Sequence, residues 1–152
     1  MVNDEYADTS KGGLTDSQFE VTSELSVLHQ KASKAANTVQ KSQDVLLDVE
    51  GLRVLLAHGK QDVKGALGRG VRVRVITEEP ENPQEARDPF GFKHPLLTVK
   101  YVPAPVPICM MIFDDKEVLL RITENDVPSF WSNNPNIANL SRTYFDEMWN
   151  KL

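Results

Sequence analysis

The chain has 152 residues, of which 40% are hydrophobic and 26% charged, and its formal net charge is −5. This size and composition fit one soluble globular domain. The negative charge argues against a general nucleic-acid surface, and no apolar run is long enough to span a bilayer. We expect a cytoplasmic protein without membrane attachment, because the N-terminus lacks a signal-peptide pattern and Cys109 is the single cysteine.

Residues 1–13 are polar, end in Gly-Gly and predict a flexible tail before one domain over residues 14–152. Thr15 and Gln18 fit a capping box that would open a long helix. Its apolar positions recur every three or four residues, at Val21, Leu25, Leu28, Ala32, Ala35 and Val39. This stripe either packs on its own domain or pairs with the same helix of a second copy, which near-heptad spacing permits.

A strand–helix–strand unit follows and is the strongest structural signal in the chain. Residues 45–49 form a short apolar run, residues 51–67 carry apolar side chains on one helical face, and residues 71–76 alternate. Such a βαβ unit predicts two parallel strands joined by a right-handed crossover.

The segment 78–95 contains four prolines and therefore predicts a long surface loop without a useful helix. Loops of this length are either binding loops or lids, or they are disordered. Phe90 and Phe92 favour a loop that folds onto the domain.

The last third predicts three strands, over residues 96–102, 108–113 and 118–122, with the last two joined as an antiparallel hairpin. Asp114 and Asp115 would be turn residues of that hairpin. We expect a helical turn near residues 127–131 and a final helix capped by Asn134. Its apolar stripe comprises Ile137, Leu140, Tyr144, Met148 and Leu152, widened by Phe145 and Trp149.

The stretch Pro107-Ile-Cys-Met-Met-Ile-Phe-Asp114 resembles the catalytic strand of the phospholipase D superfamily, which carries His-x-Lys-x-x-x-x-Asp. With Asp114 in the last position, Pro107 occupies the place of the nucleophilic histidine and Cys109 that of the lysine. The segments RGVRVRV (residues 69–75) and FDDKEVL (residues 113–119) resemble other sequence motifs of that superfamily. The resemblance implies a single phospholipase D-like repeat: an α/β domain with a mixed sheet, a βαβ unit, a C-terminal hairpin and flanking helices. It also implies that the reaction has been lost.

The C-terminal segments WSNNP (residues 131–135) and YFDEMW (residues 144–149) resemble the effector-sensing domain of archaeal TrmB-type transcriptional regulators. Related sensor domains precede some archaeal histidine kinases. A TrmB-type regulator would carry a winged helix-turn-helix, for which this chain has no room, so we expect an autonomous module or a piece of a longer protein. A helix that usually follows the second strand is replaced or shortened here by the proline-rich loop.

From the resemblance we expect a ligand-binding cleft near the strand ends, lined by Thr77, Glu78, Cys109, Asp114, Ser132, Asn133 and Asn134. Cys109 is either a small buried hydrophobe or a redox-sensitive thiol. Arg72 and Arg74 lie either on a solvated or helix-covered face or in a clamp for an anionic ligand or partner. His29, His58 and His94 lack ligand spacing, so we expect no metal and no cofactor.

The sequence therefore predicts a non-catalytic sensing or ligand-binding module. It would control a transcriptional or kinase output through a homodimer, because single-repeat members of this fold generally pair two repeats. A small-molecule effector and an output domain or partner protein would be its partners, without direct nucleic-acid binding by this domain. The alternative is an interaction or scaffold protein whose cleft is filled by side chains, and a hydrolase with unconventional residues is a remote third.

Overall fold

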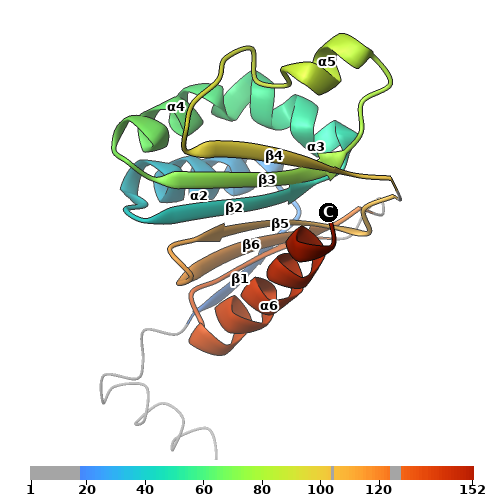
Figure 1. The fold of residues 1–152 in the computed structure, drawn as a ribbon. Coiled ribbons are helices and arrows are strands. Elements are labelled where there is room, and N and C mark those ends of the chain that lie inside the picture. The colour runs from blue at the N-terminus through green and yellow to red at the C-terminus, as the bar shows by residue number, and fades with distance from the viewer. Residues whose placement is uncertain (1–17, 104, 124–127) are drawn as a thin grey trace, which may run out of the picture.

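Residues 18–103, 105–123 and 128–152 of this computed structural model are described here. They form a three-layer α/β domain around one seven-stranded mixed sheet (Figure 1). The strand order across the sheet is β1-β7-β6-β5-β2-β3-β4. No helix within the described ranges is long and apolar enough to cross a membrane.

Strands and helices alternate in the first half of the chain, whereas four strands of the described part follow one another before the final helix. The elements are β1 (Phe19–Thr22), α2 (Leu25–Thr38), β2 (Ser42–Leu47), α3 (Val49–Val54), the π-helical turn η2 (Leu55–Gly59), α4 (Lys60–Gly68), β3 (Arg72–Glu78), α5 (Pro83–Arg87), β4 (Leu97–Val102), β5 (Ile108–Phe113), β6 (Glu117–Ile122), β7 (Ser129–Ser132) and α6 (Pro135–Lys151).

The predicted βαβ unit is confirmed. β2 and β3 are parallel, and α3, η2 and α4 run without a break between them. The Asp48 side chain caps this helix by accepting a hydrogen bond from the Gly51 N–H at 2.7 Å. β4 extends the parallel pairing beyond β3, whereas β5 and β6 form the predicted antiparallel hairpin.

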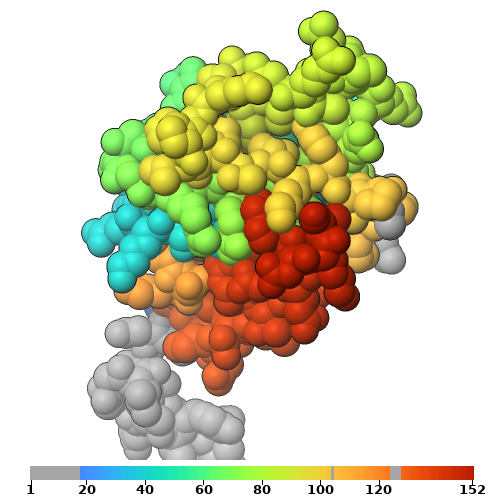
Figure 2. All heavy atoms as spheres, viewed as in Figure 1, coloured from blue at the N-terminus to red at the C-terminus, as the bar shows by residue number. Residues whose placement is uncertain are grey.

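Two apolar layers cover the two faces of the sheet, because successive side chains of a strand point to opposite faces. On one face, Val45, Val73 and Val75 pack beneath α2 and α4. On the other face, Leu46, Ile76 and Ile112 pack beneath α6. Figure 1 shows α6 on the side of the sheet opposite α2. In the space-filling view, α6 packs closely against neighbouring segments of the same chain (Figure 2).

The predicted first helix is wrong in its first turns. Residues 19–22 form β1, which pairs antiparallel with β7, and the helix begins only at Leu25. Edge pairing satisfies backbone groups that a helix would satisfy locally, so long-range pairing overrides the helical spacing here. The later positions of the stripe, among them Leu28 and Ala35, pack on the sheet of the same domain, which was the first of the two alternatives. Of the predicted capping box, Thr15 lies outside the described residues.

Two expectations about irregular segments also need correction. The helical turn expected near residues 127–131 is absent from the described part, since Ser129–Ser132 is the strand β7. The loop 78–95 contains the short helix α5, which Pro83 opens at its first turn. Phe90 is 1% exposed, so this loop does fold onto the domain.

The final helix begins after Asn134 as predicted, but its buried face is centred differently. Ala138, Ser141 and Phe145 face the sheet, whereas Leu140 is 71% exposed. The aromatic side chains at the centre of this face pack as expected, because Phe145 is fully buried and stacks on Trp149. Polar side chains share the buried face, which an apolar stripe alone cannot indicate.

The hairpin turn joins two distant parts of the chain. Asp114 and Asp115 have φ values of 55° and 57°, as a hairpin turn of type I′ requires. The Asp114 carboxylate accepts hydrogen bonds from three consecutive backbone N–H groups, those of Gln40, Lys41 and Ser42. Partial burial alone would raise the pKa of Asp114, but these three donors outweigh it and lower the pKa below its ordinary value.

We predict that Asp114→Asn destabilises the domain at pH 7 by about 1–3 kcal/mol, because a charged acceptor of three N–H groups is lost. A lowered carboxyl pKa stabilises the fold above the unfolded pKa of about 3.9, and this contribution disappears as the pH falls through the lower folded value. Urea unfolding between pH 7 and pH 2.5 should therefore show the two proteins converging below about pH 4. The control is Asp88→Asn, which makes the same change at an exposed carboxylate outside the turn, and an equal, pH-independent loss in both variants would contradict the prediction.

Candidate functional site

The structure places the seven residues expected to line the cleft at two opposite ends of the sheet. Thr77 and Glu78 end β3, and Cys109 lies beside the end of β2, so these three share one end. Asp114 follows β5 at the other end. The three C-terminal candidates lie at that same end, since Ser132 pairs with Val118. One cleft therefore does not bring all seven together.

The two β3 candidates are enclosed rather than open to a ligand. Thr77 is fully buried, and its Oγ1 has no hydrogen-bond partner among the described residues. The Glu78 carboxylate accepts hydrogen bonds from the Val49 N–H at 3.0 Å and the Val106 N–H at 2.7 Å. Glu78 thus fixes the start of α3 against the segment that enters β5.

The C-terminal candidates have structural partners as well. Ser132 donates to the Gln18 carbonyl and accepts from the Asn134 N–H. The Asn133 side chain accepts from the Gln18 N–H at 2.6 Å. Asn134 caps α6 by accepting from the N–H groups of Asn136 and Ile137. Together these contacts fasten β1 to the start of α6.

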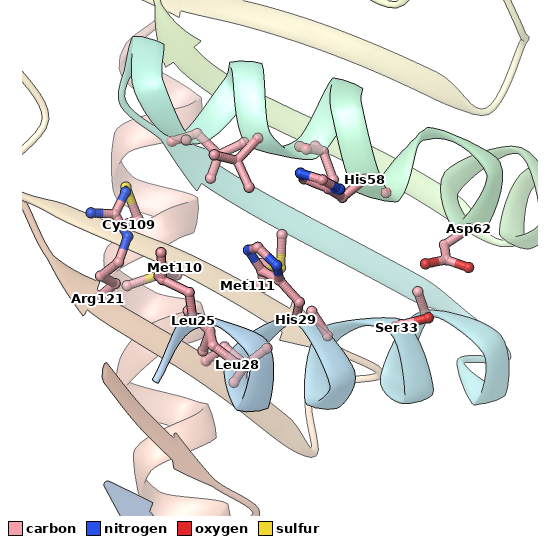
Figure 3. A pocket seen from close by; sticks show the side chains of 18 of the residues that line it. Leu25, Leu28, His29, Ser33, His58, Asp62, Cys109, Met110, Met111 and Arg121 are labelled. Carbon is pink, nitrogen blue, oxygen red and sulfur yellow. The ribbon is translucent and has the colours of Figure 1, made fainter. Parts of the chain in front are cut away.

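A pocket of about 270 Å³ opens between α2 and the α3–η2–α4 helix, above β5 and β6 (Figure 3). Most of its lining is apolar, including Leu28, Leu55 and Met111, and Cys109 is the one predicted site residue among the described lining residues. Figure 3 shows Cys109 and Arg121 together at one end of the pocket and Ser33 and Asp62 at the other. His29 and His58 stack across it with ring centroids 5.4 Å apart.

The helical wall of the pocket departs from ordinary α-helix at η2. Such π-helical turns are rare and occur frequently at functional sites. Gly59 ends this turn where a Cβ atom would approach Leu55 Cδ1 to 2.7 Å. The glycine therefore lets Leu55 lie close to the helix backbone, and both residues line the pocket.

One buried polar group lines the pocket without a partner. The Gln43 side chain comes from β2 and is 2% exposed, and its Oε1 has no hydrogen-bond partner among the described residues. Leaving such a group unsatisfied costs about 1–3 kcal/mol. An unsatisfied polar group in a native protein calls for a specific explanation, and a ligand that occupies the site is one.

Cys109 lies in a charged but largely buried environment. Its Sγ is 3.2 Å from an Arg121 guanidinium nitrogen and 3.5 Å from Asp48 Oδ1. Burial raises the pKa of the Cys109 thiol to about 11, and the neighbouring Asp48 carboxylate adds to this against the opposing charge of Arg121. Cys109 is therefore a neutral thiol at physiological pH, which favours the buried-hydrophobe reading over a reactive one.

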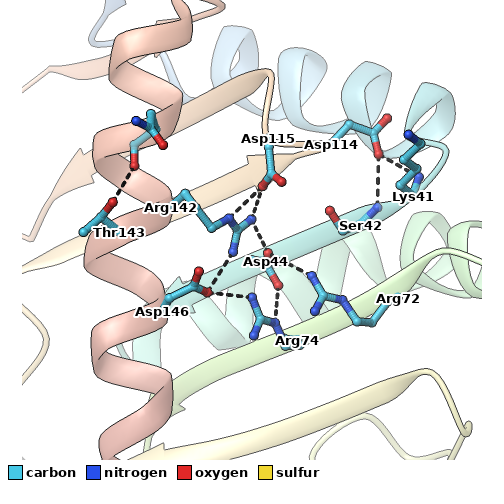
Figure 4. Close-up of polar contacts among 11 residues, drawn as sticks. Lys41, Ser42, Asp44, Arg72, Arg74, Asp114, Asp115, Arg142, Thr143 and Asp146 are labelled. Atoms are coloured by element: carbon cyan, nitrogen blue, oxygen red, sulfur yellow. Dashed lines mark hydrogen bonds and ion pairs between the residues drawn. The ribbon is translucent and has the colours of Figure 1, made fainter.

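Arg72 and Arg74 lie on the face covered by α6, in a network centred on the buried Asp44 (Figure 4). Arg74 Nε donates to Asp44 at 2.8 Å, and another Arg74 nitrogen donates to Asp146 at 3.0 Å. Arg142 pairs with Asp44, Asp115 and Asp146. These arginines are compensated by carboxylates of the same domain, so the structure favours a covered face over an anion clamp.

The described residues contain no group of three or more acidic, histidine or cysteine side chains that could hold a metal ion. His29 and His58 approach one another, but His94 instead accepts a hydrogen bond from the Leu96 N–H.

The comparisons with known proteins identify the fold. TrmBL2, an archaeal chromatin protein with a novel mode of DNA binding, superposes with a TM-score of 0.68 at 16% identity, over 99% of this chain. This chain spans 64% of the length of TrmBL2. No family model and no curated protein matches the sequence itself.

Two phospholipase D-type structures superpose over 88% of this chain and 95% of their own. NucT from Helicobacter pylori gives a TM-score of 0.65 at 15% identity, and Nuc from Salmonella typhimurium, a phospholipase D family member, gives 0.54 at 17%. The chain therefore has a phospholipase D-like fold that is similar to a TrmB-type protein. At these identities the likeness establishes the fold alone.

Sequence reasoning missed Gln43, Arg121 and the pair of histidines as pocket residues. Gln43 precedes the apolar run that begins at Val45 and has the polar neighbours Ser42 and Asp44, so nothing in the sequence indicated that this side chain is buried. Arg121 and Cys109 are cross-strand partners in the hairpin register, which a prediction of the hairpin could have indicated.

We predict that Cys109 reacts slowly with iodoacetamide in the folded protein at pH 8. With a pKa of about 11, about one thiol in a thousand is ionised at that pH, compared with roughly a quarter for an ordinary cysteine. Mass spectrometry should show labelling at least about 100-fold slower than in protein unfolded by guanidinium. Equal rates in the two states would contradict the prediction.

We also predict that Gln43→Leu stabilises the isolated protein by about 1 kcal/mol or more, because it removes a buried amide whose Oε1 has no partner among the described residues. Thermal unfolding should give a higher Tm than that of the wild type. Gln84→Leu in the exposed helix α5 makes the same chemical change outside the pocket and should leave the Tm nearly unchanged. A lower Tm for Gln43→Leu would show that the amide has a stabilising partner.

Proposed function

We propose that the protein is a non-catalytic ligand-binding module that senses a small molecule and controls a transcriptional or kinase output. The observation that carries this proposal is the pocket between α2 and the α3–η2–α4 helix, whose lining includes Gln43 with an Oε1 that has no partner among the described residues. A concave, mostly apolar site with few polar groups is typical of small-molecule binding. The phospholipase D-like fold and the likeness to a TrmB-type protein support a regulatory role.

The residues at the equivalents of the catalytic positions support the absence of phosphodiesterase activity. Pro107 offers no side-chain nucleophile where the resemblance implies histidine. Cys109 is a buried neutral thiol where the resemblance implies a lysine that compensates phosphate charge. Asp114 binds the backbone of residues 40–42 at the opposite end of the sheet, away from Cys109.

Pairing of two copies is part of the proposal, and the edge strand β1 offers a surface for it. Phe19 and Val21 project from the same face of this strand and are 55% and 65% exposed. β1 lies at the edge of the sheet, where its free backbone groups can pair with another strand. A second copy would present the same strand, which gives a self-complementary contact. The ligand would act by a shift of population between dimer arrangements.

An interaction or scaffold protein is the second candidate, and a single feature favours it. α2 contributes small residues such as Ala32 and Ala36 to the pocket wall, so a modest movement of this helix toward α4 would narrow the space. In that case only the surfaces would be used and no small molecule would bind.

Native mass spectrometry of gently purified protein tests the proposal. We expect a dimer that carries an additional mass, which is removed by collisional activation or mild denaturation. The variant Ala32→Phe, which fills the pocket from α2, should lose the additional mass, whereas Val21→Lys should give a monomer that keeps it. A bare monomer from the wild type would move the scaffold interpretation to first place. Turnover of a generic phosphodiester that Cys109→Ala abolishes would refute the non-catalytic assignment.

A further inference from the structure

We propose that the ligand of this pocket is a compact, uncharged, mainly apolar molecule with one hydrogen-bond donor. This group would donate to Gln43 Oε1. This inference rests on the proposed ligand-binding function and names the chemical class of the ligand. It is carried by the size of the pocket, by the polarity of its lining and by the single unsatisfied acceptor in its wall.

The size of the pocket limits the ligand to roughly one substituted ring or a short branched chain. An engineered apolar cavity of about 150 Å³ in another protein binds benzene. The space here is about 270 Å³, which is slightly below the range of about 300–1,000 Å³ for drug-sized ligands. Nucleotides and oligosaccharides are therefore too large to be enclosed.

The lining favours an apolar body. Aliphatic and thioether side chains from both helical walls and from β2, β5 and β6 surround the space, including Leu28, Leu47, Leu55, Met111 and Leu119. The polar lining groups Ser33 and Asp62 lie at one end and Arg121 at the other, and His29 and His58 stack between them (Figure 3). An apolar molecule gains by displacing water from such a surface.

The charges around the pocket disfavour an anion. Arg121 is the one permanently cationic side chain among the described lining residues, and it already faces Asp48 at 3.4 Å. Glu50 and Asp62 add two carboxylates to the lining. A carboxylate or phosphate would need a free arginine or lysine to compensate its charge, and the lining supplies none.

The Gln43 amide supplies the specific contact. It projects from the β2 floor on the same face as Leu47, and the two are lining residues from the same strand. Oε1 has no hydrogen-bond partner among the described residues, so a ligand hydroxyl or N–H that reaches it would form a hydrogen bond without displacing another protein group. A site with a buried acceptor rejects an analogue that lacks the donor, because the acceptor then stays unpaired.

Isothermal titration at pH 7 with three probes of one shape tests this class: 4-ethylphenol, ethylbenzene and 4-ethylbenzoate. The wild type should bind 4-ethylphenol roughly tenfold more tightly than ethylbenzene, and 4-ethylbenzoate weakest of all. In Gln43→Leu this preference for the phenol should disappear, while Gln84→Leu should keep it. Gln43→Met, whose side chain has a similar length, is the second variant if the leucine variant does not fold.

The outcomes separate this inference from the proposed function. Binding of both neutral probes without preference, or a preference that survives Gln43→Leu, would overturn the ligand class and leave a ligand-binding module in place. Tighter binding of 4-ethylbenzoate would overturn the class in favour of an anion. If no probe binds, the class is refuted, and the additional mass in native mass spectrometry then decides whether the proposed function survives. Ala32→Phe should abolish binding of every probe, which assigns the binding to this pocket.

Discussion

The buried carboxylate of Asp44 is the interaction on which the arrangement of the domain depends. It is fully buried in the central strand β2, and its ion pairs reach Arg72 and Arg74 of β3 and Arg142 of α6. An uncompensated charge at this depth would cost several kcal/mol, so the fold requires the three arginines to lie within ion-pair distance of Asp44. Arg142 also pairs with Asp115, which extends the same network to the β5–β6 turn.

The two ends of the sheet are held by different contacts. At the end where β2 and β3 begin, charges and backbone hydrogen bonds lock the hairpin turn, the start of β2 and helix α6 together. Asp114 completes this locked end by holding residues 40–42. At the other end, Glu78 holds the start of α3. The pocket between α2 and η2 extends along the strands from Cys109 to Gln43, so the locked end forms part of its wall.

The sequence predicts the part of this fold that local periodicity specifies. The βαβ unit over residues 45–76 and the hairpin of β5 and β6 rest on patterns within a few neighbouring turns or strands, and both are present. The strand β1 and its partner β7 lie more than 100 residues apart in the chain, and no local pattern links them. Short edge strands of this kind depend on tertiary pairing, which explains why Phe19–Thr22 was assigned to a helix.

The candidate site was predicted less well, for a related reason. The resemblance identifies residues by their place in a motif, but the structure shows that most of those positions hold the fold together. Glu78, Asp114 and Asn134 each accept backbone hydrogen bonds, and such roles are invisible without the partner segment. The pocket is instead built by side chains from α2, η2 and three strands that no motif connects.

The retained polarity of β2 is the strongest argument that the pocket serves a function. Asp44 and Gln43 are neighbours in a strand whose six residues are all buried. The Asp44 charge is compensated by three arginines, so its burial has a structural reason. Gln43 Oε1 has no hydrogen-bond partner among the described residues, and an apolar side chain of similar size would fit the stability of the isolated domain better. Natural proteins depart from local stability chiefly where function requires it. The contrast between these two adjacent residues therefore supports the proposed binding function at the α2 face of the sheet, opposite the structural anchor at the α6 face.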